Sequence, residues 1–165
     1  EFRRVLFRSK GRTVFIADTT IHELPSAREM AEIAIEAAAA ARRMGHEPRV
    51  ALTSFSTFGN PARAKAADVR DAVRELDNRK VDFEYDGEMS AEVALDQALM
   101  RAAYPFCRLS GPANVLVMPG LHSANISSQL MEKLGGVTVV GPMLIGLSKP
   151  AQIVYLGAKI GRAHV

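Results

Sequence analysis

The sequence predicts an α/β fold with three layers, in which a mostly parallel sheet carries helices on both faces. Short runs of β-branched and apolar residues alternate along the chain with helical patterns of about 10–15 residues. The connections between them are short and are marked by Gly, Pro, Ser and Asp. No internal repeat interrupts this order, so we expect one folding unit.

Each expected strand is a short apolar run that stops at a polar residue, a glycine or a proline. The runs are 13–17, 49–53, 81–85, 114–119, 138–140 and 152–156. The run at 114–119 is almost continuously apolar, which is typical of a strand buried on both faces. The run at 81–85 instead alternates polar and apolar residues.

Four helices are expected between these strands, over 26–44, 62–76, 90–103 and 124–134. The first has the clearest signals. Ser26 followed by Glu29 is a capping-box pattern, and Gly45 stands where a left-handed C-terminal residue is expected.

Composition excludes several classes of protein. No apolar run approaches the roughly 18–20 residues that cross a bilayer, so we expect no membrane span. The one cysteine, Cys107, cannot form an internal disulfide, and its apolar setting predicts a buried, inert thiol in a reducing, cytoplasmic location. No glycine-rich dinucleotide fingerprint and no P-loop is present, so hydride chemistry is not expected in this chain.

The two ends of the chain resemble the translation of a short-read sequencing adapter. These segments are residues 1–9 and 160–165, and the domain would then cover 10–159 as an internal part of a longer gene. The net charge of +3 falls to zero without them, so we expect no nucleic-acid partner. Such segments should be exposed or poorly ordered; the alternative is a genuine basic N-terminal arm.

Candidate ligand-binding residues follow the second expected strand. In open α/β sheets, ligands bind beyond the carboxyl ends of the strands. Hydroxyls, an amide and a glycine before a helix suit a phosphate or acyl-phosphate, and they are provided by Ser54, Ser56, Thr57, Gly59 and Asn60. The alternative is that these are ordinary turn and cap residues.

Later strand ends supply further candidates. Asp86 and Glu88 could act as a general base or hold a cation, although a solvated turn gives the same pattern. Asn125, Gly141 and Pro142 complete the expected ligand cleft. We expect no catalytic residue and no metal site in this chain.

Several motifs resemble the phosphate acetyl/butyryl transferase family, in order over essentially all of 10–158. They are the segments 15–20, 31–34, 47–56, 86–89, 111–116 and 140–142, together with 149–150. Residues 18–20 and 149–153 are most similar to the phosphotransacetylase-like C-terminal domain of bacterial NADP-dependent malic enzymes.

The resemblance implies a two-subdomain fold of the isocitrate/isopropylmalate dehydrogenase type, of which this chain is mainly the second subdomain. Coenzyme A and acetyl phosphate would bind in the cleft between subdomains, with arginines supplied by the first. The family's Ser-Arg pair aligns with Tyr155 and Leu156 here, and the position of the aspartate that deprotonates the thiol falls among the suspected adapter residues. Acetyl transfer is therefore not expected.

The resemblance thus implies a regulatory, oligomerising domain of an NADP-dependent malic enzyme that binds acetyl-CoA. NADP and Mg²⁺ or Mn²⁺, with the oxidative decarboxylation of malate to pyruvate, would belong to an upstream domain. The implied partners are acetyl-CoA or acetyl phosphate and further copies of the same chain. The alternatives are a phosphate acetyltransferase, which moves acetyl between acetyl phosphate and coenzyme A, and a structural dimerisation module.

Overall fold

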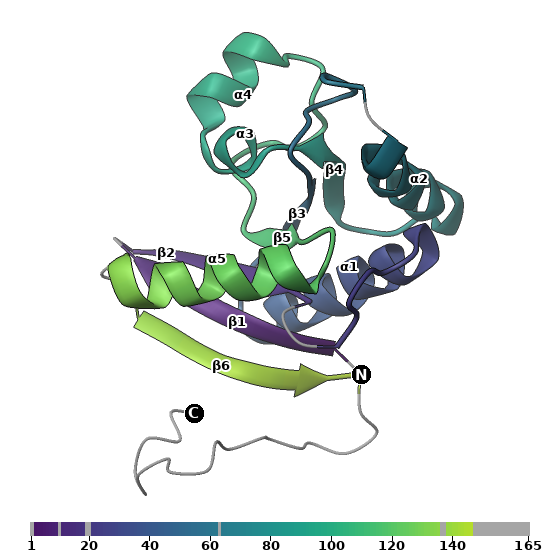
Figure 1. Ribbon diagram of the computed structural model, residues 1–165. Helices are drawn as coiled ribbons and strands as arrows, with labels where there is room; N and C mark the ends of the chain where they lie inside the picture. Colours follow the sequence, from purple (N-terminus) through teal and green to yellow (C-terminus); the bar gives the residue numbers. More distant parts are fainter. Residues whose placement is uncertain (1, 10, 19–20, 63, 136–137, 147–165) are drawn as a thin grey trace, which may run out of the picture.

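The computed structural model describes residues 2–9, 11–18, 21–62, 64–135 and 138–146. Within these residues, six strands form one sheet in the order β4-β3-β5-β2-β1-β6 (Figure 1). The strands are β1 Phe2–Ser9, β2 Arg12–Ala17, β3 Arg49–Thr53, β4 Glu84–Met89, β5 Val115–Val117 and β6 Thr138–Ile145. β2, β5, β3 and β4 are mutually parallel, whereas β1 runs antiparallel to both β2 and β6.

The helices cover both faces of this sheet, which confirms the predicted mostly parallel α/β fold. They are α1 Ala27–Arg43, α2 Ala64–Arg79, α3 Ala91–Leu95, α4 Gln97–Ala103 and α5 Leu121–Leu134. α1 and α2 pack on one face, and α3 and α4 pack on the other. In Figure 1, α5 lies in front of the sheet and α1 behind it. None of the helices in the described part of the chain is long and apolar enough to span a bilayer.

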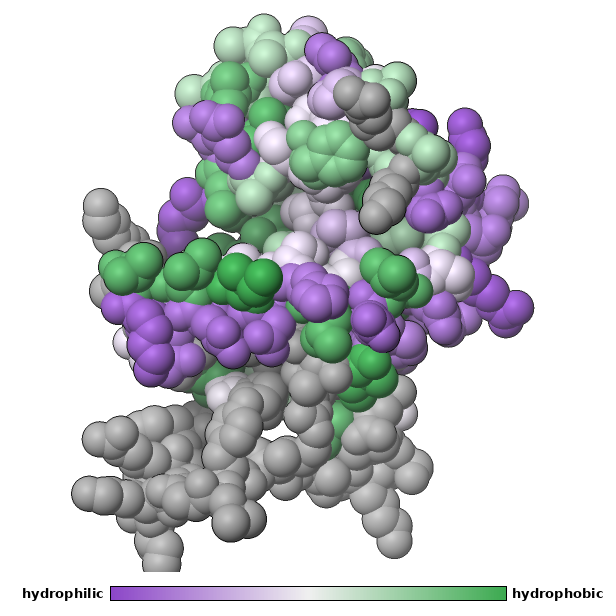
Figure 2. Space-filling view, viewed as in Figure 1, coloured by the Kyte–Doolittle hydropathy of each residue, from purple (hydrophilic) through white to green (hydrophobic). Residues whose placement is uncertain are grey.

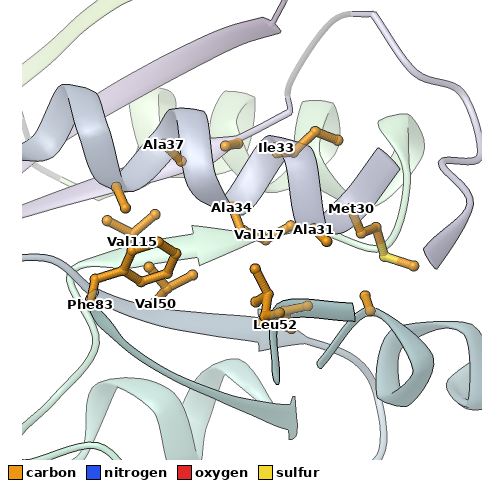
Figure 3. Close-up of a cluster of buried hydrophobic side chains, with 14 of the residues drawn as sticks. Met30, Ala31, Ile33, Ala34, Ala37, Val50, Leu52, Phe83, Val115 and Val117 are labelled. Atoms are coloured by element: carbon orange, nitrogen blue, oxygen red, sulfur yellow. The ribbon is translucent and has the colours of Figure 1, made fainter. Parts of the chain in front are cut away.

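Alternation along the central strands creates the two cores. Val50 and Leu52 of β3 point toward α1 and α2, and Ala51 between them points toward α3 and α4. β5 repeats the pattern with Val115 and Val117 on the α1 side. Figure 3 shows α1 laying a row of small side chains over these residues, namely Ala31, Ala34 and Ala37.

The signals at both ends of α1 are confirmed. The Ser26 backbone N–H donates to Glu29 Oε2 at 2.8 Å, and the Glu29 N–H donates back to Ser26 Oγ at 3.3 Å. At the other end Gly45 has φ +81°, and its N–H donates to the carbonyl of Arg42 at 2.9 Å.

Two elements differ from their sequence-based predictions. The helix expected over 90–103 is divided at Asp96, which ends α3 and caps α4 by accepting from the Leu99 N–H at 3.0 Å. The strand expected at 81–85 begins instead at Glu84, because Glu84 to Gly87 pair one for one with Arg49 to Leu52 of β3. Asp86 and Glu88 therefore lie within a strand rather than in a turn after it.

The outer strands also differ from expectation. The backbone of residues 2–9 was expected to be exposed or poorly ordered, yet it forms β1 and pairs on both sides, for example Val5 with Ile16 and Leu6 with Val140. Phe2, Val5 and Phe7 are aromatic or β-branched residues that suit a strand, which explains the difference. Residues 160–165 and the strand expected at 152–156 lie outside the described residues, and the adapter origin of both ends remains a prediction.

Gly87 is expected to tolerate no side chain. Its φ is +156°, and an added Cβ would lie 2.7 Å from the Leu52 carbonyl oxygen, which is backbone of the neighbouring strand. Gly87→Ala should lower the free energy of unfolding by about 1–3 kcal/mol in urea denaturation. Gly111→Ala is the control, since its Cβ would make an ordinary van der Waals contact with the Arg49 side chain at 3.4 Å. Equal losses in the two variants would contradict this reasoning.

Candidate functional site

A pocket of about 620 Å³ opens at the carboxyl ends of β2, β3 and β5. Its walls come from the segment before α1, the loop after β3, the first turn of α1, the second turn of α2, and the start of α5. The lining residues are Glu23, Leu24, Pro25, Ser26, Ala27, Glu29, Met30, Ser54, Phe55, Asp68, Val69, Pro119, Gly120, His122 and Ser123. This is the edge at which open α/β sheets bind ligands.

The start of α5 gives the pocket its hydrogen-bond donors. Gly120 is the N-cap residue and provides no side-chain cap for the helix. The first-turn N–H groups of His122 and Ser123 are therefore left without an intrahelical acceptor at the pocket wall. A helix N-terminus of this kind favours an anionic or strongly polar group.

Acidic side chains also line this pocket. Glu23, Glu29 and Asp68 line the pocket, and no Lys or Arg side chain among the described residues does so. Hydrogen bonds from the backbone and the hydroxyl of Ser26 lower the pKa of Glu29, so this carboxylate stays ionised at neutral pH. The pocket therefore suits a polar ligand more readily than a bare multiply charged anion.

The predicted loop after β3 is divided between two environments. Ser54 lines the pocket. Ser56, Thr57 and Gly59 instead turn toward β4: Ser56 Oγ donates to Glu88 Oε1 at 2.5 Å, and the Gly59 N–H donates to the same oxygen at 3.2 Å. Thr57 Oγ1 accepts from the Ser90 N–H at 3.0 Å, which fastens the loop to the start of α3.

Glu88 is the centre of this second environment. Its side chain is 0% exposed, so the solvated-turn alternative is wrong for this residue. Arg70 of α2 binds both carboxylate oxygens from Nη1, at 2.9 and 3.0 Å. The carboxylate is thus occupied by internal hydrogen bonds and stabilises the loop between β3 and α2.

Asp86 is also buried and engaged. It accepts from its neighbour Gly87 N–H at 2.9 Å and from the Arg108 N–H at 2.8 Å, and Arg108 Nε lies 3.4 Å from Oδ1. Next to it, burial raises the pKa of the Cys107 thiol, in agreement with the inert cysteine predicted from the sequence.

The remaining predicted residues are not brought to this pocket. Asn60 forms a tight turn with Thr57 and is exposed. Asn125 is exposed on α5 and is absent from the pocket wall. Gly141 and Pro142 were expected in a loop beside the Ser54 loop, but they lie within β6, which β1, β2 and β5 separate from β3.

Several pocket residues were missed by the sequence analysis. Ser26 and Glu29 were recognised as a helix start and not as part of a site, although the same capping box marks a helix N-terminus at the expected edge. His122 and Ser123 follow the predicted strand at 114–119, within the range that the strand-end rule singles out, but they were not included among the candidate residues. No group of three or more His, Cys, Asp or Glu residues in the described ranges is placed to hold a metal ion.

Comparison with known proteins agrees with this architecture. Residues 4–162 match the phosphate acetyl/butaryl transferase family. The chain belongs to this family. The NADP-dependent malic enzyme of Rhizobium meliloti is 56% identical over 150 residues, which are 91% of this chain and 20% of that protein. The phosphate acetyltransferase of Paracoccus denitrificans is 41% identical over 143 residues, which are 86% of this chain and 45% of that protein.

Solved phosphotransacetylases share the fold. The EutD phosphotransacetylase from Staphylococcus aureus superposes with a TM-score of 0.87 at 29% identity, over 95% of this chain and 49% of that one. The chain therefore spans about a fifth of its malic enzyme relatives and about half of the phosphotransacetylases. It is a phosphotransacetylase-like domain of the kind found in both groups of proteins.

Removing the partner of Glu88 should destabilise the domain. Arg70→Met leaves a fully buried carboxylate without its cation, and we expect the free energy of unfolding to fall by about 3 kcal/mol in urea denaturation. Arg74→Met, on the same helix in an exposed pair with Asp71, should cost less than about 1 kcal/mol. Arg70→Met combined with Glu88→Gln should recover part of the loss; no recovery would show that the charge of Glu88 is not the cause.

Asp77 should make the stability of the domain depend on pH. Burial acts to raise its pKa, but hydrogen bonds from Tyr85 Oη and Arg108 Nη1, each 2.6 Å long, outweigh it, and the net pKa is lowered. Its stabilising contribution is then present above the unfolded pKa of about 4 and is lost as pH falls through the lower folded pKa. The stability difference between the wild type and Asp77→Asn should shrink between about pH 5 and pH 3 in thermal melts. A constant difference across that range would exclude this role.

Proposed function

We propose that this chain is the phosphotransacetylase-like domain of an NADP-dependent malic enzyme, in which it binds acetyl-CoA or acetyl phosphate and regulates and assembles the enzyme. Malate oxidation, NADP and the divalent cation would belong to the rest of the protein. The observation that carries the proposal is the pocket at the carboxyl ends of β2, β3 and β5, into which α5 presents its N-terminus.

The pocket offers both parts of an acyl ligand a matching surface. The hydroxyl of Ser54 and the first-turn N–H groups of α5 suit a carbonyl oxygen, whereas the Ser123 hydroxyl donates to the Gly120 carbonyl at 2.8 Å. Leu24 and Phe55 are 79% and 62% exposed at the same pocket, and they suit a hydrocarbon segment.

Binding without acetyl transfer is favoured by the charges of the pocket wall. A transferase must stabilise negative charge that develops on the transferring group, and losing one partner of this kind costs about 10²–10³ in rate. The described pocket wall carries Glu23, Glu29 and Asp68 and no Lys or Arg. The family's Ser-Arg pair also aligns with Tyr155 and Leu156, as the sequence resemblance implies.

A phosphate acetyltransferase is the second candidate. The 41% identity to the Paracoccus denitrificans enzyme and the TM-score of 0.87 to the Staphylococcus aureus phosphotransacetylase favour it. In this case the positive charges would have to come from residues other than those of the described pocket wall.

The assembly role is supported by the outer face of α5. Ile126, Leu130 and Leu134 follow one another at intervals of four residues and are 55%, 54% and 80% exposed. Figure 2 shows the apolar row that they form along this helix. Two copies crossing antiparallel at Leu130 would place Ile126 of one against Leu134 of the other, which is the self-complementarity that a symmetric dimer needs.

The proposal is tested in the full-length parent protein. Malate-dependent NADP reduction should change on addition of acetyl-CoA, and acetyl phosphate plus coenzyme A should give no acetyl-CoA. Ser54→Ala should weaken acetyl-CoA binding about fivefold in calorimetry, since one hydrogen bond of about 1 kcal/mol is lost. Asn78→Ala, an exposed position at the end of α2 outside the pocket, is the control.

The alternative functions give different results. Acetyl-CoA synthesis without malate oxidation would establish the phosphate acetyltransferase. Malate oxidation that acetyl-CoA leaves unchanged would leave a structural dimerisation module.

A further inference from the structure

The arginines in the described part of the chain fall into two groups. The first group forms ion pairs with carboxylates, and the second group does not. The paired arginines are Arg28, Arg42, Arg70, Arg74, Arg79 and Arg108. Arg12, Arg43, Arg49 and Arg101 have no carboxylate within ion-pair distance among the described residues. Arg43 stands apart at the end of α1, and the other three are Arg12, Arg49 and Arg101. Unpaired guanidinium groups that gather at one place indicate a surface suited to an anion.

These three arginines lie together at the amino ends of the parallel strands. Arg12 is the first residue of β2 and Arg49 the first residue of β3, and β5 lies between these two strands. Two adjoining pockets open there, one lined by Arg12 and Arg101, the other by Arg12, Arg49 and His46. Arg12 and Pro112 line both pockets, so the two pockets adjoin and the three arginines border one site. This site lies at the edge of the sheet opposite the acyl-ligand pocket.

Each guanidinium is positioned by one backbone carbonyl. Arg12 Nη2 donates to Leu95 O at 3.2 Å, Arg49 Nε to Pro112 O at 2.8 Å, and Arg101 Nη2 to Leu109 O at 2.8 Å. A guanidinium has five N–H donors, so each of these arginines is held in place with most of its donors still available.

The acidic residue that lines the larger of these pockets does not neutralise them. Asp96 directs Oδ1 to the Leu99 N–H at the start of α4 and forms no ion pair with Arg12 or Arg101. Positive charge therefore exceeds negative charge along this surface.

We propose that the amino edge of the sheet binds a small ligand that carries two or more linked phosphate groups. Guanidinium forks match phosphate oxygens in pairs, and cations spread along two joined pockets suit linked phosphates better than a single one. The site is separate from the acyl-ligand pocket and does not depend on the proposed function, and it would let a phosphorylated metabolite act on the domain from the opposite edge.

Inorganic pyrophosphate is the probe, titrated calorimetrically into this chain at about 0.1 M salt. Saturable binding at one site is expected, and binding should weaken as salt is raised because the contacts are ionic. Arg12→Gln combined with Arg101→Gln should reduce affinity at least tenfold, while glutamine keeps an amide donor for the carbonyls that the arginines bind. Thermal melts of the variant establish that it remains folded.

The control is Arg43→Gln, an exposed arginine at the end of α1 that lines neither pocket. It should leave pyrophosphate affinity unchanged, as should Ser54→Ala with Ser123→Ala in the acyl-ligand pocket. Orthophosphate should bind at least tenfold more weakly than pyrophosphate. Absence of saturable binding, equal affinity for the two anions, or loss of binding in either control would overturn the proposal.

Discussion

The site depends on one buried charge. Glu88 lies at the end of β4 with its side chain wholly excluded from water, and a carboxylate in that position is stable only while hydrogen bonds surround it. Arg70 reaches it from α2, and Ser56 and Gly59 reach it from the loop after β3. A strand, a loop and a helix are thus held in one arrangement by the need to keep this ion paired.

This arrangement explains why the loop after β3 has two different sides. Once Ser56 and Gly59 are bound to Glu88, the preceding Ser54 and Phe55 are left on the opposite side, against the pocket. The residues of this loop therefore have two different roles. Some hold the loop in shape, and the first two form part of the pocket surface.

Sequence reasoning reached the fold because each signal was local. The capping box at Ser26, the glycine at 45 and the apolar run at 114–119 each specify an element without reference to the rest of the chain. It failed where partners distant in sequence decide the outcome. The position of β4 is set by its pairing with β3, and the burial of Glu88 depends on an arginine 18 residues away. A pocket lies at the edge of the sheet where a ligand site was predicted, but which side chains face it depends on these same distant contacts.

The alanine-rich face of α1 lowers the entropy cost of packing this helix on the sheet. Ala31, Ala34, Ala37, Ala38 and Ala41 are all fully or almost fully buried. Alanine has no side-chain rotamers to lose, so this contact forms without the entropy cost that longer side chains carry. Ser26 and Glu29, which α1 carries at its N-terminus, are placed at the pocket by this contact.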